Sequence, residues 1–181
     1  MKHLLNELSK QEIALYEKAV SLQGSMEDKT QQLKEAGVFA AYKILHQAYL
    51  LLFEQTTEPD IKSEALKRLI FLNWYSILEP PCFTGIAELS HEVIASSFEK
   101  LDKYLTEQRL DKEFLWMLSF YSCWDYIILM FSDPDLPELT KFVHSIDTEV
   151  LHVPKHQLPK GTMDNRGQLG MYWQSLSVEK E

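Results

Sequence analysis

The feature of this 181-residue sequence that most limits its fold is the spacing of its apolar residues. From the N-terminus to about residue 146 they recur every three or four positions, and strand-like alternation is rare. This spacing places apolar side chains on one face of a helix. The sequence therefore predicts an all-α fold, a single-domain bundle of about six mostly antiparallel helices near residues 3–22, 25–55, 58–78, 84–105, 114–131 and 136–145. A faint repeat at a spacing of 50 residues, around Trp74 and Trp124, leaves stacked helical hairpins as the alternative architecture.

The segment from Phe114 to Phe131 tests whether this bundle is soluble, because its 18 residues carry one formal charge, Asp125. A membrane span needs roughly 20 apolar residues, and an acidic side chain at its centre costs roughly 2.5 kcal/mol or more. We therefore expect a buried helix rather than a membrane span. The N-terminal residues lack the apolar run of a secretory signal, and Cys82 and Cys123 require no oxidising compartment. We expect a cytoplasmic protein.

The composition changes after Asp147, where proline and glycine become frequent. We predict a helical domain over residues 1–147 and an irregular C-terminal extension over residues 148–181, because Pro and Gly interrupt helices. Tyr172 and Trp173 are aromatic anchors that a freely disordered tail would lack. We therefore expect the extension to pack on the bundle, with the last eight residues, 174–181, frayed.

The net charge of −9 excludes one large class of partner, because a nucleic-acid-binding surface needs clustered basic residues and this sequence has no such run. The acidic residues are concentrated between positions 113 and 149, where seven acids face one base, Lys141. This region is either a solvated face or a docking surface for a basic protein partner. The candidate partner-binding residues combine its acidic side chains with the aromatic anchors of the extension: Asp133, Asp135, Glu138, Tyr172 and Trp173.

Asp125 is the most informative single residue, because it lies within the apolar segment together with Ser119 and Ser122 at intervals of three. A buried carboxylate needs a partner, so we expect a tyrosine, His46, Arg68 or Arg109 beside it. The set is either a closed polar network or the lining of a small cleft. On either interpretation Asp125→Ala should cost about 1–3 kcal/mol of stability. The candidate ligand-binding residues are Asp125, Ser122, Tyr126, His46 and His91.

Glu-x-x-His occurs twice, at Glu88/His91 and Glu149/His152, and two such pairs hold the metals of di-iron bundles. On a helix, however, Glu88 would point about 150° away from the apolar stripe, and the second pair lies beside Pro154. We therefore predict no metal and no cofactor. Cys82 lies near a helix start without a placed base, which favours a packing role over a nucleophile. The sequence contains no Gly-rich phosphate loop, Gly-x-Ser-x-Gly or His-Glu-x-x-His.

These observations favour a non-enzymatic, acidic helical module that binds, neutralises or scaffolds another protein. The alternative is a helix-bundle protein that binds a small molecule or a metal, which includes a di-iron-type enzyme, at a polar cleft near Asp125. A cavity beside Asp125 would favour the alternative, and a solid core with an acidic face would favour the interaction module.

Overall fold

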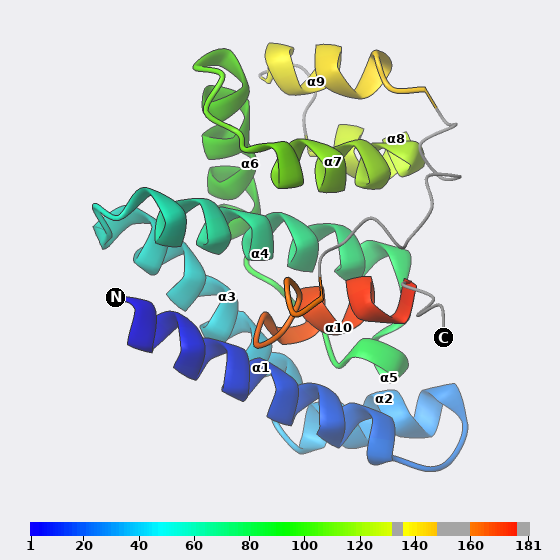
Figure 1. Cartoon of the computed structure of the whole chain (residues 1–181). Coiled ribbons are helices and arrows are strands. Elements are labelled where there is room, and N and C mark those ends of the chain that lie inside the picture. The colour runs from blue at the N-terminus through cyan, green and yellow to red at the C-terminus, as the bar shows by residue number, and fades with distance from the viewer. Residues whose placement is uncertain (132–135, 148–159, 177–181) are drawn as a thin grey trace. The chain divides into compact units, whose positions relative to one another are not determined.

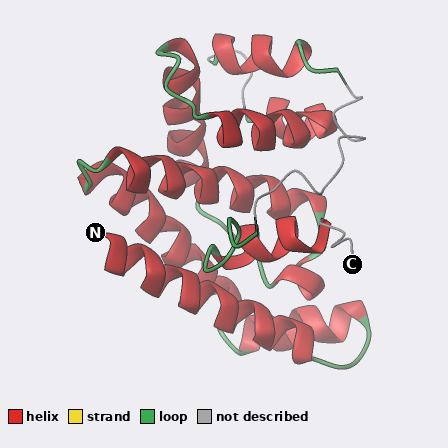
Figure 2. Cartoon of the chain, viewed as in Figure 1, coloured by secondary structure: helices red, strands yellow, loops and turns green. Residues whose placement is uncertain are grey.

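The structure is a computed structural model that describes residues 1–131, 136–147 and 160–176. Its described residues contain helices and no strand, which confirms the all-α prediction (Figures 1 and 2). The elements are α1 (Lys2–Ser21), α2 (Met26–Glu35), α3 (Val38–Gln55), α4 (Pro59–Leu78), α5 (Pro81–Thr84), α6 (His91–Thr106), α7 (Lys112–Tyr121), the 3-10 turn η1 (Ser122–Trp124), α8 (Asp125–Leu129), α9 (Pro137–His144) and α10 (Gly167–Leu176).

Local chemistry explains where most of the helices begin. Ser25 and Asp28 form a reciprocal capping box at the start of α2, and Pro59 occupies the first turn of α4. The Asp111 carboxylate accepts the backbone N–H of Phe114 at 2.8 Å and caps α7. Side chains of these types satisfy backbone donors that the first helical turn leaves unpaired.

Three of the predicted helices are shorter than expected. The helix expected over 25–55 is divided at Gly37, whose φ of 71° ends α2 and begins α3. The helix expected from residue 84 begins only at His91, because Gly85 and Glu88 adopt positive φ values of 76° and 53°. The helix expected over 114–131 is interrupted at Ser122–Trp124 by a 3-10 turn, and Trp124 leaves the helical region with φ −105° and ψ 63°.

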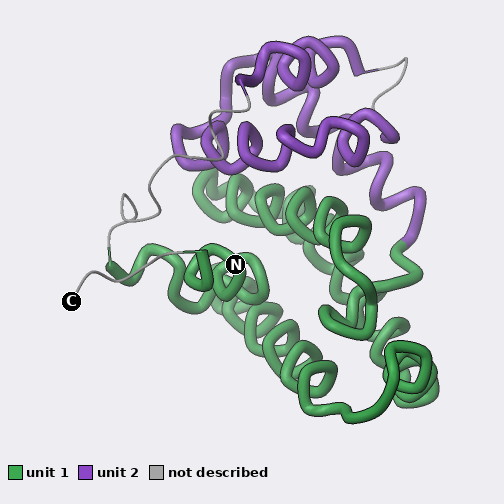
Figure 3. Tube along the Cα trace, turned by 90° about the vertical axis from the view of Figure 1, so that its right-hand side faces the viewer, with its two compact units in different colours: residues 1–89, 154–181 green, residues 90–153 purple. Residues whose placement is uncertain are grey.

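The chain divides into two compact units that do not match the expected boundary at residue 147. Unit 1 comprises residues 1–89 together with 154–181, and unit 2 comprises residues 90–153 (Figure 3, green and purple). Unit 2 is therefore inserted in the sequence between two parts of unit 1. Whether residues 1–147 act as one domain stays a prediction.

Unit 1 is built around the packing of α3 against α4, and α1 packs on α3. Its core includes the fully buried aromatic side chains of Tyr42, Tyr49, Phe71 and Trp74. Helix α10 packs against both α1 and α4 and so joins the C-terminal part of the sequence to the N-terminal helices (Figure 1).

The expectation of an irregular extension is wrong for α10, because two glycines that suggested a break serve close packing instead. A Cβ at Gly170 would collide with the carbonyl oxygen of Met163, and Gly167 needs its positive φ of 59° to begin the helix. The expected fraying also fails for Gln174 to Leu176, which are helical, and residues 177–181 lie outside the described residues.

Unit 2 is a smaller cluster of α6, α7, α8 and α9. The rings of Phe98 and Phe131 stack with centroids 5.2 Å apart, and the Asp102 carboxylate accepts the backbone N–H of Leu139 at 2.7 Å. In the described part of the chain, no single helix is long and apolar enough to cross a bilayer, and one bent pair, α2 with α3, meets the criteria of length and composition.

Candidate functional site

The ligand-binding cluster predicted around Asp125 does not form. Asp125 is exposed, and its carboxylate accepts only the adjacent backbone N–H of Tyr126, at 2.7 Å, among the hydrogen bonds of the described residues. The physical reason is the interruption at Ser122–Trp124, which changes the helical phase and turns Asp125 away from the core. Ser122 is buried, and its hydroxyl donates to the Leu118 carbonyl at 2.8 Å, a hydrogen bond to the preceding helical turn.

The two histidines predicted to bind a ligand, His91 and His46, belong to different units and differ in exposure. His91 is exposed at the first position of α6, and Glu88 forms a surface ion pair with Lys34 at 3.4 Å. Within the described ranges no group of three or more potential metal ligands comes together. The second expected pair, Glu149/His152, lies outside the described residues.

His46 is a core residue of α3 in unit 1. Its side chain is fully buried, and neither ring nitrogen makes a hydrogen bond of good geometry to the described residues, although the Asn73 side chain lies beside the ring. Burial lowers the pKa of His46 to about 4, and Asn73 opposes this shift. The imidazole is therefore neutral near pH 7.

Of the predicted partner-binding residues, Tyr172 and Trp173 belong to unit 1 and Glu138 to unit 2. Trp173 is 3% exposed, and Tyr172 packs its ring against those of Phe71, Trp74 and Tyr75 at centroid distances of 5.6, 5.5 and 5.2 Å. Both aromatic side chains therefore pack α10 within unit 1, as expected for anchors of the C-terminal segment, and their role in binding a partner stays a prediction. Glu138 pairs with Lys141 at 3.6 Å on α9, and Asp133 and Asp135 lie outside the described residues.

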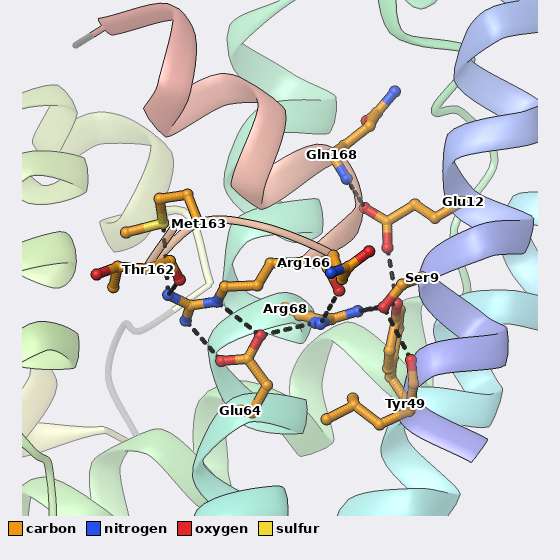
Figure 4. Close-up of polar contacts among 11 residues, drawn as sticks. Ser9, Glu12, Tyr49, Glu64, Arg68, Thr162, Met163, Arg166 and Gln168 are labelled. Carbon is orange, nitrogen blue, oxygen red and sulfur yellow. Dashed lines mark hydrogen bonds and ion pairs between the residues drawn. The ribbon is translucent and has the colours of Figure 1, made fainter. Parts of the chain in front are cut away.

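A polar cluster that the sequence does not predict lies inside unit 1 (Figure 4). Its centre is Arg68 on α4, whose side chain is 2% exposed. The guanidinium donates through Nε to Glu64 Oε1 at 2.9 Å and through Nη1 to the hydroxyls of Ser9 and Tyr49, the latter at 2.9 Å. Nη2 donates to the backbone carbonyl of Asn165 at 3.3 Å.

Glu12, on α1, is the second acid of this cluster, and its side chain is fully inaccessible to solvent. Its Oε2 accepts the Tyr49 hydroxyl at 2.7 Å, and its Oε1 accepts the backbone N–H of Gln168 at 2.6 Å. Burial raises the pKa of Glu12, while the charge of Arg68 and these two hydrogen bonds oppose the shift. Tyr49 thus relays a hydrogen bond from Arg68 to Glu12, and Glu12 caps the start of α10 from a distant helix.

Arg166 completes the cluster from the C-terminal segment. Its Nε donates to Glu64 Oε1 at 2.9 Å and its Nη2 donates to Glu64 Oε2 at 2.5 Å, a bidentate pairing. Glu64 is therefore shared between two arginines. With Glu12 included, two cations and two anions balance, which offsets the cost of removing these charges from water.

Two open clefts flank the turn formed by residues 164–166. The larger, of about 860 Å³, is bordered by the first half of α1, by Glu64 and Arg68, and by this turn. The smaller, of about 430 Å³, lies against the same turn together with Ile13, Met163 and the start of α10. Both clefts belong to unit 1.

Two charged residues at otherwise apolar positions of the sequence belong to this cluster. Glu12 falls on the same helical stripe as Leu5, Leu8 and Ala19, where a carboxylate is unexpected. Arg68 stands with Lys67 among the apolar residues of positions 65–72, and the sequence predicts it only as a possible partner of Asp125. A charged residue on an apolar stripe indicates a buried pair, but the spacing alone does not name its partner.

Comparison with protein-family models, curated proteins and solved structures gave no match. The function is therefore inferred from the chain's own residues.

Proposed function

We propose that this protein is a non-enzymatic interaction module that binds a basic segment of another protein through unit 2. The charge distribution supports this proposal. Residues 90–153 hold twelve acidic and five basic residues, a net charge of −7, whereas the two parts of unit 1 hold fifteen and thirteen, a net charge of −2. Charge of one sign on a small unit raises the rate of encounter with a partner of the opposite sign.

The observation that carries the proposal is an exposed apolar pair on α8. Tyr126 is 58% exposed and Met130, the C-cap residue of the helix, is 61% exposed. They lie one turn apart, because the Met130 N–H donates to the Tyr126 carbonyl at 3.2 Å. The intervening Ile127 and Ile128 are fully buried, so they fix this face outward.

Aromatic and methionine side chains are enriched at the centres of protein interfaces, where a desolvated anchor contributes most of the affinity. The exposed carboxylate of Asp125 adjoins this pair and places a negative charge at its edge, where a lysine or arginine of the partner can pair with it. The partner chemistry that fits is therefore a basic segment with an apolar side chain that covers Tyr126 and Met130.

Position-specific photocrosslinking tests this proposal. A photoreactive phenylalanine analogue replaces Tyr126 in one sample and Ile44 in another; Ile44 is 70% exposed on α3 of unit 1 and serves as the matched control. We expect an adduct from position 126 whose crosslinked peptide is rich in Lys and Arg, and whose yield falls as salt is raised through the range that screens surface charge. Equal adducts from positions 126 and 44, or a partner peptide without basic residues, would contradict the proposal.

A second variant pair tests affinity without a probe. Tyr126→Ser combined with Met130→Ser should weaken binding of the identified partner segment by roughly tenfold or more, since interface anchors contribute about 2 kcal/mol. Ile44→Ser combined with Leu51→Ser removes two exposed apolar side chains from α3, 70% and 45% exposed, and should leave the affinity unchanged.

A second candidate function is favoured by the larger cleft. Its volume of about 860 Å³ lies in the range of small-molecule sites, roughly 300–1,000 Å³, and buried charges form part of its border. This cleft belongs to unit 1, whereas the cleft expected from the sequence lay near Asp125 in unit 2. A thermal-shift screen of polar metabolites tests this candidate. A compound that raises the melting temperature of the unchanged protein, but not that of the Asn6→Ala variant, would support it, because Asn6 borders the cleft.

A further inference from the structure

The segment of residues 160–176 is held in unit 1 in the manner of a bound peptide. Its polar contacts run from Arg166 to Glu64 and from the Gln168 N–H to Glu12 (Figure 4). Gln168 Nε2 also donates to the Thr84 carbonyl at 2.7 Å. Its apolar contacts come from three buried side chains, Met163, Leu169 and Trp173. We call the surface of unit 1 that receives it, formed by Glu12, Glu64, Arg68 and Thr84, the C-terminal groove.

The C-terminal groove is chemically selective. Without the segment it holds two carboxylates and one guanidinium, so an arginine at position 166 is needed to balance the charge. Position 167 admits only glycine, because its φ is 59° and an added Cβ would lie 2.5 Å from the Glu12 carboxyl group. The groove therefore fits an arginine followed by glycine at the start of a helix, which is the chemistry of this chain's own segment.

One end of the attachment lies beside open space. The turn over residues 164–166 borders two open clefts, of about 860 and 430 Å³, and Asn165 holds a positive φ of 59°. Water therefore reaches the attachment from the side of this turn, although the hydrogen bonds that Gln168 makes to Glu12 and Thr84 are buried. Twelve residues, 148–159, connect the segment to the described part of unit 2, a length of chain that spans at most roughly 40 Å.

We propose that the C-terminal groove also accepts residues 160–176 of a second copy of this chain, so that two chains exchange these segments and each groove is completed by the other chain's arginine. A segment that closes on its own chain has an effective concentration on the order of 1 mM. The closed monomer therefore dominates in dilute solution. The exchanged dimer forms at high protein concentration or when pairing within one chain is mismatched.

Complementary charge reversal in the full-length chain tests this exchange. The Glu64→Arg variant brings three cations together within one chain, the introduced arginine with Arg68 and Arg166, and the Arg166→Glu variant opposes two carboxylates. When the chains are combined, the introduced arginine of one faces the introduced glutamate of the other, and the unchanged Glu64 faces the unchanged Arg166. Both grooves are thus matched only in the mixed dimer.

The two variants are co-expressed with different tags, purified through both tags, and weighed by native mass spectrometry. We expect a doubly tagged species near twice 21.2 kDa, enriched roughly tenfold or more over co-expressed copies of either variant alone. Both substitutions combined in one chain should restore a monomer. The matched control reverses an exposed ion pair of unit 1, Lys34→Glu with Glu88→Lys, and should give no mixed dimer.

Absence of the doubly tagged species, or its formation to the same extent by the control pair, overturns the proposal. If either variant alone is insoluble, co-expression still decides, since exchange predicts that the pair rescues both chains as a soluble mixed dimer. Failure of that rescue counts against exchange.

Discussion

Replacing Gly167 with alanine measures how tightly the start of α10 fits against Glu12. Two costs add in this variant. A non-glycine residue at φ 59° costs about 1–2 kcal/mol, and the new Cβ would lie 2.5 Å from a carboxyl group that Tyr49 and Gln168 hold in place. Moving the carboxyl group away sacrifices its hydrogen bond from the Gln168 N–H, which is charge-assisted and contributes about 1.5–3 kcal/mol. The expected loss of unfolding free energy is about 2.5–5 kcal/mol.

The assay is urea denaturation of the full chain, with Gly37→Ala as the matched control. Gly37 has a similar φ of 71°, but nothing lies within 4 Å of an added Cβ, so this variant reports the backbone cost alone, about 1–2 kcal/mol. The difference between the two variants isolates the collision with Glu12. Equal losses at Gly167 and Gly37 would refute the close fit and, with it, the capping role of Glu12.

Three further predictions follow from buried and exposed polar groups. Tyr49→Phe should lower the unfolding free energy measured in urea by about 1.5–3 kcal/mol, because the Tyr49 hydroxyl bridges Arg68 and Glu12. Tyr42→Phe should lower it by about 1 kcal/mol, because the Tyr42 hydroxyl donates only to the backbone carbonyl of Glu12, at 3.2 Å. Asp125→Ala should change stability by less than about 0.5 kcal/mol, in contrast to the 1–3 kcal/mol expected for a buried residue. His46 has a pKa of about 4 when folded and near 6.5 when unfolded, so the unfolded chain binds the extra proton; stability is full above pH 6.5 and falls by up to about 3 kcal/mol as the pH drops to 4. Denaturation of His46→Leu across this pH range should show a correspondingly flatter profile.

The periodicity of the sequence was sufficient to predict helices, and capping residues such as Asp111 were sufficient to place several of their starts. The interruption at Ser122–Trp124 could not be predicted, because hydroxyl-to-carbonyl bonds such as the one from Ser122 to Leu118 are compatible with a continuous helix as well. That single break moved Asp125 from the expected core to the surface. Local sequence fixes a helical phase only as long as the helix continues.

The polar cluster escaped prediction for a different reason. Its decisive contacts join positions 102 and 156 residues apart, from Glu64 to Arg166 and from Glu12 to Gln168. Helical periodicity relates neighbours within a few turns and carries no information about such pairs. Glycine at position 167 was equally ambiguous, since the same residue type ends helices and permits close approach.

The insertion of residues 90–153 within unit 1 has a consequence for synthesis on the ribosome. At roughly 5–20 residues per second, about 4–15 s pass between the emergence of Leu89 and that of Arg166. During this interval Glu12, Glu64 and Arg68 have left the ribosome without the arginine and backbone amide that neutralise and cap them. Unit 1 therefore reaches its final arrangement only after unit 2 has been made. A nascent chain stalled before residue 160 would expose Glu12 and Glu64 without Arg166 to the chaperones of the cell.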